Sequence, residues 1–220
     1  MDTHFYIDGF NLYYGCLAGT PYRWLNLEKL CASVLPGHNV TAVKYFTARI
    51  SAQPWDPQGP QRVIRQQVYL RALATLPLVT TFFGHFQTSE KWLGLVQPPK
   101  MKPSLQLAPG APVPQVACVL KSEEKGSDVN LATQLLHDAH LKRFQQAVVI
   151  SADSDLANPI IIVTQELGLP VGIVSPRKNF VRLRQIASFT RRIRTVALTS
   201  SQFANTLSDA NGTFTKPAIW

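Results

Sequence analysis

The stretch His4-Phe5-Tyr6-Ile7-Asp8-Gly9-Phe10-Asn11 decides the fold, because it is typical of a short apolar strand that breaks at an acidic turn. Two later stretches have a related pattern. Glu123-Glu124-Lys125-Gly126-Ser127-Asp128 leads into a predicted helix, and Asp153-Ser154-Asp155 follows a predicted strand. In open α/β sheets the ligand crevice lies outside the carboxyl ends of the strands. We therefore expect the three acidic turns to meet at one edge of a parallel sheet.

The rest of the chain alternates between strand and helix patterns. Strands are predicted at 4–7, 41–50, 78–86, 116–121, 147–152 and 171–174, and helices at 25–35, 62–75, 128–139 and 160–167. Residues 11–17 are predicted to be helical or irregular. The nearly continuous apolar run at 147–152 is typical of a strand buried on both faces. Ser127 is the expected N-cap of the 128–139 helix. This alternation predicts an α/β fold, a three-layer sandwich with a mainly parallel sheet.

Length and proline content predict the domain organisation. A chain of 220 residues is expected to form one domain with a sizeable core. Residues 97–114 contain six prolines and are predicted to be an inserted flexible loop. We therefore predict a single domain at 1–198 with that Pro-rich insertion, followed by a C-terminal tail at 199–220.

Charge and cysteine content narrow the function classes. The net charge of +9 and the pI near 9.7 fit a polyanionic partner such as RNA, although many basic proteins bind nothing acidic. Cys16, Cys31 and Cys118 form no CxxC pair, so they predict reduced thiols of a cytoplasmic protein without disulfides or zinc. No apolar run has the length of a membrane span, and the N-terminus lacks a signal-peptide pattern. The sequence leaves open whether the chain forms a homodimer.

The acidic turns also have structural interpretations when taken singly. Asp8 before Gly9 could close a turn, Asp128 could complement a helix dipole, and Asp155 could be a helix cap. None of these explains the same placement three times. Converging carboxylates repel one another unless protons or a cation neutralise them, and a hard divalent cation suits several Asp oxygens. The pattern therefore favours metal-dependent phosphodiester chemistry.

Three segments resemble the signatures of the NYN domain, which belongs to the PIN-like nuclease superfamily. They are Phe5-Tyr6-Ile7-Asp8-Gly9-Phe10-Asn11-Leu12, Glu124-Lys125-Gly126-Ser127-Asp128-Val129-Asn130-Leu131 and Ile150-Ser151-Ala152-Asp153-Ser154-Asp155-Leu156. The match keeps the family's order and covers roughly residues 3–175. The stretch at 207–214 also resembles a tail found in one bacterial branch. The resemblance implies a PIN-like Rossmannoid fold and cleavage of RNA that depends on Mg²⁺ or Mn²⁺.

Carried over by position, the resemblance assigns the site residues. Asp8, Asp128, Asp153 and Asp155 would be catalytic metal ligands, and Asn11 would support Asp8 or orient a water molecule. Glu124 matches the motif, either as a supporting residue or as an exposed one. Such an acidic site would be of the two-metal type, and a cation held there would generate hydroxide that attacks phosphorus in line. The alternatives are a catalytically weak RNA-binding or regulatory module and the nuclease toxin of a partner-restrained system.

RNA contacts are expected from basic residues outside the acidic turns. No acid lies between Leu167 and Ser208, whereas that segment carries several cations, including Arg177, Lys178, Arg182 and Arg184. This run predicts a surface that follows phosphates, and a solvated basic face is the alternative. Lys125 could bind a phosphate oxygen or balance the neighbouring glutamates.

Overall fold

The computed structural model describes residues 1–53, 55–101, 104, 106, 108 and 110–220. Its centre is a seven-stranded sheet with the order β4-β3-β2-β1-β5-β6-β7, beside a separate β8-β9 hairpin. The strands are β1 (Asp2–Asp8), β2 (Asn39–Ala48), β3 (Val79–Gly94), β4 (Val116–Lys125), β5 (Gln146–Ile150), β6 (Val171–Ser175), β7 (Phe189–Arg192), β8 (Thr206–Asp209) and β9 (Gly212–Thr215). All neighbours in the large sheet run parallel except β3 and β4. The predicted mainly parallel α/β fold is confirmed.

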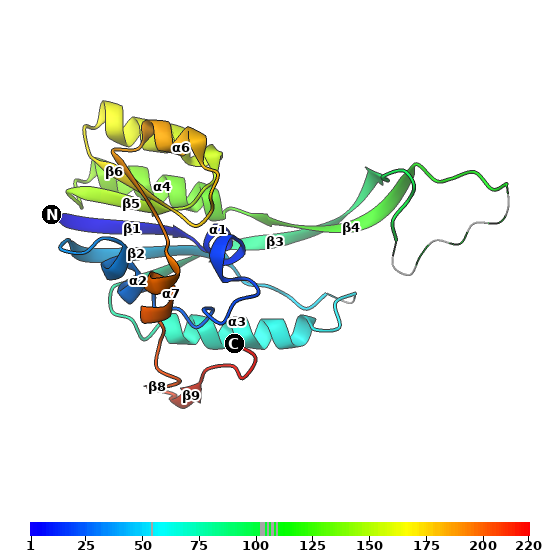
Figure 1. Ribbon diagram of the computed structural model, residues 1–220, viewed down its shortest axis with the longest axis horizontal. Coiled ribbons are helices and arrows are strands. Elements are labelled where there is room, and N and C mark those ends of the chain that lie inside the picture. The colour runs from blue at the N-terminus through cyan, green and yellow to red at the C-terminus, as the bar shows by residue number, and fades with distance from the viewer. Residues whose placement is uncertain (54, 102–103, 105, 107, 109) are drawn as a thin grey trace.

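Helices cover both faces of the sheet (Figure 1). They are α1 (Gly9–Leu12), α2 (Leu27–Val34), α3 (Gly59–Leu73), α4 (Ser127–His140), α5 (Ala157–Ile161), α6 (Val181–Ile186) and α7 (Thr195–Ser200), with π-helical turns η1 (Tyr13–Leu17) and η3 (Ile162–Glu166) and the 3-10 turn η2 (Ser154–Leu156). In β1, Phe5 and Ile7 join the core beneath α2 and α3, whereas Tyr6 joins the core beneath α4 and α5. This alternation produces the three layers. No helix in the described ranges is both long and apolar enough to cross a bilayer.

The strand β3 is longer than the predicted strand at 78–86. Its first part, Val79 to Gly84, pairs with β2, and its second part, His85 to Gly94, pairs antiparallel with β4. The β4 strand likewise continues past the predicted 116–121 to Lys125. Together the two strands form an arm that projects from the sheet (Figure 1). The predicted Pro-rich insertion connects them, and residues 102, 103, 105, 107 and 109 of it lie outside the described residues.

Ser127 is not the N-cap of α4, so that prediction was wrong. The cap position belongs to Gly126, whose φ of 97° lies in the left-handed region that favours glycine. Ser127 is the first helical residue. Its backbone N–H and its hydroxyl both donate to Glu124 Oε1, at 3.0 Å and 2.7 Å. A carboxylate from the preceding strand therefore caps this helix.

The segment after β7 packs onto the α2–α3 side of the sheet. Arg71 on α3 donates two hydrogen bonds of 2.7 Å to Asp209 and lies 4.2 Å from the ring centroid of Phe214. Trp220 packs against Trp24 and Tyr69. These contacts attach the β8-β9 hairpin to α3 and place residue 220 beside the buried aromatic core.

A buried ionic cluster joins α4 to the sheet. Asp138 on α4 is fully buried, accepts a 2.6 Å hydrogen bond from the Tyr6 hydroxyl, and forms ion pairs with Lys44 and Arg143. Burial alone would raise the pKa of Asp138, but the hydrogen bonds from Lys44 and Tyr6 hold that pKa below its ordinary value. The carboxylate is therefore neutralised inside the protein by Lys44 on β2 and by Arg143 after α4, and Tyr6 on β1 adds a hydrogen bond.

We expect Asp138→Asn to destabilise the fold by about 3 kcal/mol at neutral pH, because it leaves the Lys44 ammonium buried without its counter-charge. Urea unfolding monitored by circular dichroism measures the change. Since the folded pKa of Asp138 is lowered, the difference between wild type and variant should shrink as the pH falls below the ordinary value of 3.8. The partly exposed control Glu123→Gln, which breaks ion pairs on the arm, should leave the unfolding midpoint unchanged. An equal loss in both variants would contradict this account.

Candidate active site

Asp8 ends β1 and begins the site. Its Oδ1 accepts the Asn11 backbone N–H at 2.9 Å, which caps α1, and its Oδ2 accepts the Ser151 hydroxyl at 3.0 Å. The residue is only 3% exposed, and this burial raises the pKa of Asp8 although both hydrogen bonds oppose the shift. Gly9 is required because a Cβ there would lie 2.7 Å from the Phe46 carbonyl oxygen.

The turn after β5 is attached directly to Asp8. The fully buried Ser151 donates to Asp8 and accepts the Asp153 backbone N–H at 3.0 Å. Asn11 Oδ1 accepts the Ala152 backbone N–H at 3.2 Å, so Asn11 joins the same two turns. Asp153 Oδ1 accepts the Asp155 backbone N–H at 3.0 Å and caps η2. The turns after β1 and β5 are thus one hydrogen-bonded unit.

The third acidic turn reaches the site from the base of the β3-β4 arm. Asp128 lies in the first turn of α4, and Glu124 lies near the end of β4. A Cβ at Gly84 would lie 2.3 Å from Glu124 Oε1 and 2.5 Å from the Lys125 carbonyl oxygen. Gly84 therefore lets β3 pass close to the β4–α4 turn, which brings Asp128 toward the other acids.

The acids meet in a recess of about 300 Å³. Its lining is Asp8, Phe10, Asn11, Tyr14, Phe86, Glu124, Asp128 and Asp153. Partial burial, followed by the charges of Asp8, Asp153, Glu124 and Asp155, raises the pKa of Asp128 to about 6. Asp155 itself is exposed and is not part of the lining, although its charge acts on Asp128. The structure thus brings together Asp8, Asn11, Asp128 and Asp153 of the predicted residues.

The donor chemistry of the recess fits a hard divalent cation. All its acidic donors are carboxylate oxygens, and burial, with their mutual repulsion as the second cause, raises the pKa of Asp128. Within the described ranges, however, no three His, Cys, Asp or Glu side chains are placed as a ready ligand set. A cation would therefore have to draw the partly exposed carboxylates of Asp128 and Asp153 toward the fixed Asp8.

The predicted RNA-binding residues are all exposed. Lys125 forms an ion pair of 3.4 Å with Glu123, which is the balancing role considered for it. Arg177 and Lys178 follow β6, whose neighbour in the sheet is β5. Arg182 and Arg184 lie on α6. These positions leave the cations accessible, and their contact with RNA stays a prediction.

Sequence reasoning missed several residues of the recess. Ser151 lies inside the third NYN-like segment, at 150–156. Its position directly after a buried strand was the available signal that it holds the acidic turn in place. Phe10 and Tyr14 are four residues apart after the first acidic turn, which places them on one helical face. Phe86 comes from β3 and packs edge-to-face on Phe10 at 5.8 Å between ring centroids. That contact could not be found without the sheet order.

The NYN domain family model matches residues 3–193. The chain belongs to the NYN domain family. Its match begins in β1 and ends just after β7, so it includes the whole seven-stranded sheet and all three acidic turns. The NYN domain therefore accounts for both the sheet and the recess, and this membership suggests a PIN-like nuclease fold.

Two further comparisons place this NYN domain among known proteins. It is 31% identical over 200 residues to the 6-hydroxy-3-succinoylpyridine 3-monooxygenase HspA of Pseudomonas putida, an alignment that covers 80% of this chain and 60% of that protein. A crystal structure of a protein of unknown function from Vibrio parahaemolyticus superposes with a TM-score of 0.54 at 14% identity, covering 92% of this chain and 96% of the other. The second likeness shows the fold alone.

We expect Asp128→Asn to stabilise the folded protein at neutral pH without divalent cations. The folded pKa of about 6 exceeds the ordinary 3.8, so ionised Asp128 costs stability at neutral pH, and that cost disappears as the pH falls below 3.8. The gain should be about 1 to 2 kcal/mol after allowance for partial solvent exposure. Thermal unfolding with a chelator measures it. The exposed control Glu166→Gln carries the same charge change and should show no gain. A loss of stability in Asp128→Asn would refute the conclusion that burial and the neighbouring carboxylates make ionised Asp128 unfavourable.

Proposed function

We propose that this protein is a metal-dependent ribonuclease that hydrolyses RNA phosphodiester bonds. The observation that supports this most is the meeting of Asp8, Asp128 and Asp153, from three different turns, in one open recess. Asp155 would complete the set at its exposed rim. Membership of the NYN family supports the same function, because this family is generally nuclease-like. Mg²⁺ or Mn²⁺ suits the oxygen donors.

Each residue of the candidate site has a defined task in this proposal. Asp8, fixed by Asn11 and Ser151, would hold the cation from a constant position, and Asp128 and Asp153 would supply the other ligand oxygens. A cation held there would supply Lewis-acid activation of water and would offset the phosphate charge. Phe10 and Phe86 form the wall between the recess and the larger cavity that is described below. Exposed cations then hold the flanking phosphates: Lys125, Arg177, Lys178, Arg182 and Arg184.

Cleavage of labelled single-stranded RNA, with and without Mg²⁺ or Mn²⁺, tests the proposal. Wild type should cut only with a cation, and Asp128→Asn should cut about 100-fold more slowly or not at all. This substitution is informative because the variant is expected to be at least as stable as wild type, so its inactivity would not come from unfolding. Asp153→Asn should behave in the same way, and Glu166→Gln should retain activity. Equal cleavage by wild type and both Asn variants would reject the site.

Other results would favour the alternatives. RNA binding without cleavage under either cation would favour the RNA-binding or regulatory module. Cleavage that appears only after a bound protein is removed would favour the partner-restrained toxin. A chelator-resistant activity would contradict the metal-dependent mechanism altogether.

The relative from Pseudomonas putida supports a second candidate, hydroxylation of an aromatic heterocycle. That protein is named a monooxygenase acting on a hydroxypyridine with an acidic side chain, and this chain spans 60% of its length. A monooxygenase inserts one oxygen atom of O₂ into its substrate and reduces the other to water with two electrons from a reductant. The observation that favours this candidate here is a large cavity beside the acidic recess, lined by aromatic rings and arginines.

An oxygen electrode separates the two candidates. Oxygen uptake that requires both a hydroxypyridine carboxylic acid and a reduced nicotinamide or flavin would establish the hydroxylase. The same preparation should also be assayed for RNA cleavage with Mn²⁺. For the ribonuclease we expect RNA cleavage and no substrate-dependent oxygen uptake.

A further inference from the structure

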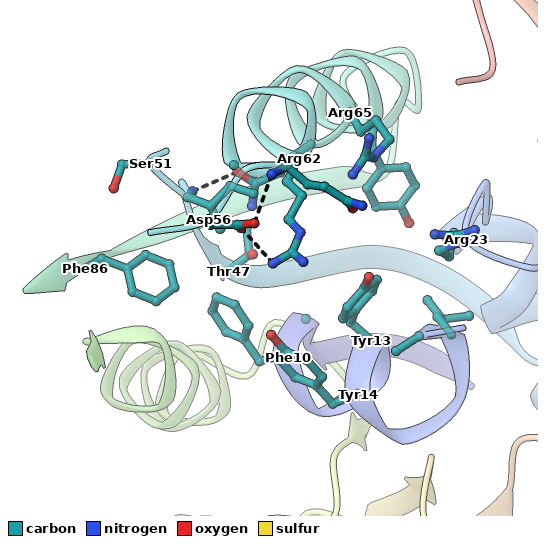
Figure 2. Close-up of a pocket in the computed structure, with 18 of the residues that line it drawn as sticks. Phe10, Tyr13, Tyr14, Arg23, Thr47, Ser51, Asp56, Arg62, Arg65 and Phe86 are labelled. Carbon is teal, nitrogen blue, oxygen red and sulfur yellow. Dashed lines mark hydrogen bonds and ion pairs between the residues drawn. The ribbon is translucent and has the colours of Figure 1, made fainter. Parts of the chain in front are cut away.

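A cavity of about 600 Å³ lies between α3 and the α1–η1 segment (Figure 2). It shares Phe10, Tyr14 and Phe86 with the acidic recess, so these three side chains separate the two spaces. The volume is that of a site for a ligand of nucleotide size. None of the predicted catalytic or RNA-binding residues lines this cavity.

Aromatic rings form much of the cavity wall. They come from five parts of the chain and comprise Phe10, Tyr13, Tyr14, Tyr45, Tyr69, Phe86 and Trp220. Tyr14 is 66% exposed, and Tyr13 packs edge-to-face against it at 5.1 Å between ring centroids. Exposed rings facing a cavity offer stacking surfaces for a planar ligand.

The charged groups of the same cavity are mainly cationic. Arg62 and Arg65 lie on α3 on one side, and Arg23 lies at one end (Figure 2). Asp56 is the acid in this lining, and it pairs with Arg62 at 2.9 Å. Among the described residues, Arg65 and Arg23 form no ion pair with a carboxylate. An anionic group would therefore find uncompensated guanidinium charge here.

Hydrogen bonds hold the wall in place without a ligand. Gln66 on α3 donates to the Ala48 carbonyl at 2.8 Å and accepts the Ile50 N–H at 2.9 Å, which fixes the chain after β2. The buried Tyr69 hydroxyl donates to the Leu25 carbonyl at 2.9 Å. Arg23 donates to the Ile219 carbonyl at 2.7 Å and lies 5.8 Å from the Trp220 ring centroid. The cavity is thus preformed, which lowers the entropy cost of binding.

We propose that this cavity binds a planar heteroaromatic ring that carries an anionic group. The ring stacks against Tyr14 and its aromatic neighbours, and the anionic group lies on Arg65, with Arg62, which Asp56 already pairs, beside it. Two sources share this chemistry: a nucleotide of RNA next to the cleaved phosphate, and a free heteroaromatic acid. The proposal does not depend on cation binding in the acidic recess or on the reaction performed there.

Binding of small probes in the presence of a chelator tests this site independently of catalysis. We expect calorimetric binding of uridine 5′-monophosphate or of nicotinate, whereas uridine, which lacks the anion, and ribose 5-phosphate, which lacks the ring, should bind more weakly. Arg65→Gln and Tyr14→Ala should each weaken binding by about tenfold. The control Lys29→Gln, an exposed cation on α2 outside the lining, should leave the affinity unchanged.

Each result has a defined meaning. Binding of uridine monophosphate alone would support the site and identify a nucleotide as its ligand, and binding of nicotinate alone would support it with a free aromatic acid as its ligand. The proposal is overturned if neither probe binds up to about 10 mM, or if both substitutions leave the affinity unchanged. Circular dichroism confirms that each variant folds, and Arg62→Gln replaces Arg65→Gln if that variant does not. If the wild-type protein binds a probe but does not cleave RNA, the ribonuclease proposal is contradicted and the binding-site proposal is not.

Discussion

The buried carboxylate of Asp8 is the interaction on which the site depends. It lies at the end of β1, in the middle of the sheet, and holds both the first turn of α1 and Ser151 after β5. A buried charged group is costly unless it is hydrogen-bonded, so these two contacts stabilise Asp8 and fix the turns at once. Because Ser151 and Asn11 also hold the 152–153 backbone, Asp153 takes its place from the same network.

Two aspartates of α4 show how the same residue type serves opposite purposes. Asp138, near the C-terminal end of the helix, is surrounded by Lys44, Arg143 and Tyr6, and its pKa is held low. Asp128, in the first turn, faces other carboxylates, and its pKa is raised to about 6. The first arrangement neutralises charge within the chain and stabilises the fold. The second leaves negative charge that a ligand from outside can neutralise, which is the usual condition of a functional site.

Local sequence patterns predicted the central strands and the acidic turns, because burial on both faces leaves an almost uninterrupted apolar run such as 147–150. They failed where the structure depends on distant contacts. The cap of α4 comes from Glu124 on a strand, which a search for an adjacent Ser or Asp cannot find. The short β7, β8 and β9 strands carry weak patterns; β7 is fixed by pairing with β6, and the β8-β9 hairpin is fixed by Arg71 on α3. The aromatic cavity combines segments from Gly9 to Trp220, so no local motif marks it.

The Phe10–Phe86 contact gives the two cavities a common wall with opposite charge on its two sides. The recess presents Asp8, Asp128 and Asp153, whereas the larger cavity presents arginines. An anionic ligand is repelled by the recess until a cation is bound there, but it is attracted to the arginines at once. This charge separation would let a ligand dock by its ring and anionic group first and reach the carboxylates afterwards. This order of docking, first in the larger cavity and then at the recess, follows from the placement of charge on the two sides of Phe10 and Phe86. It would apply to a nucleotide and to a smaller aromatic acid alike.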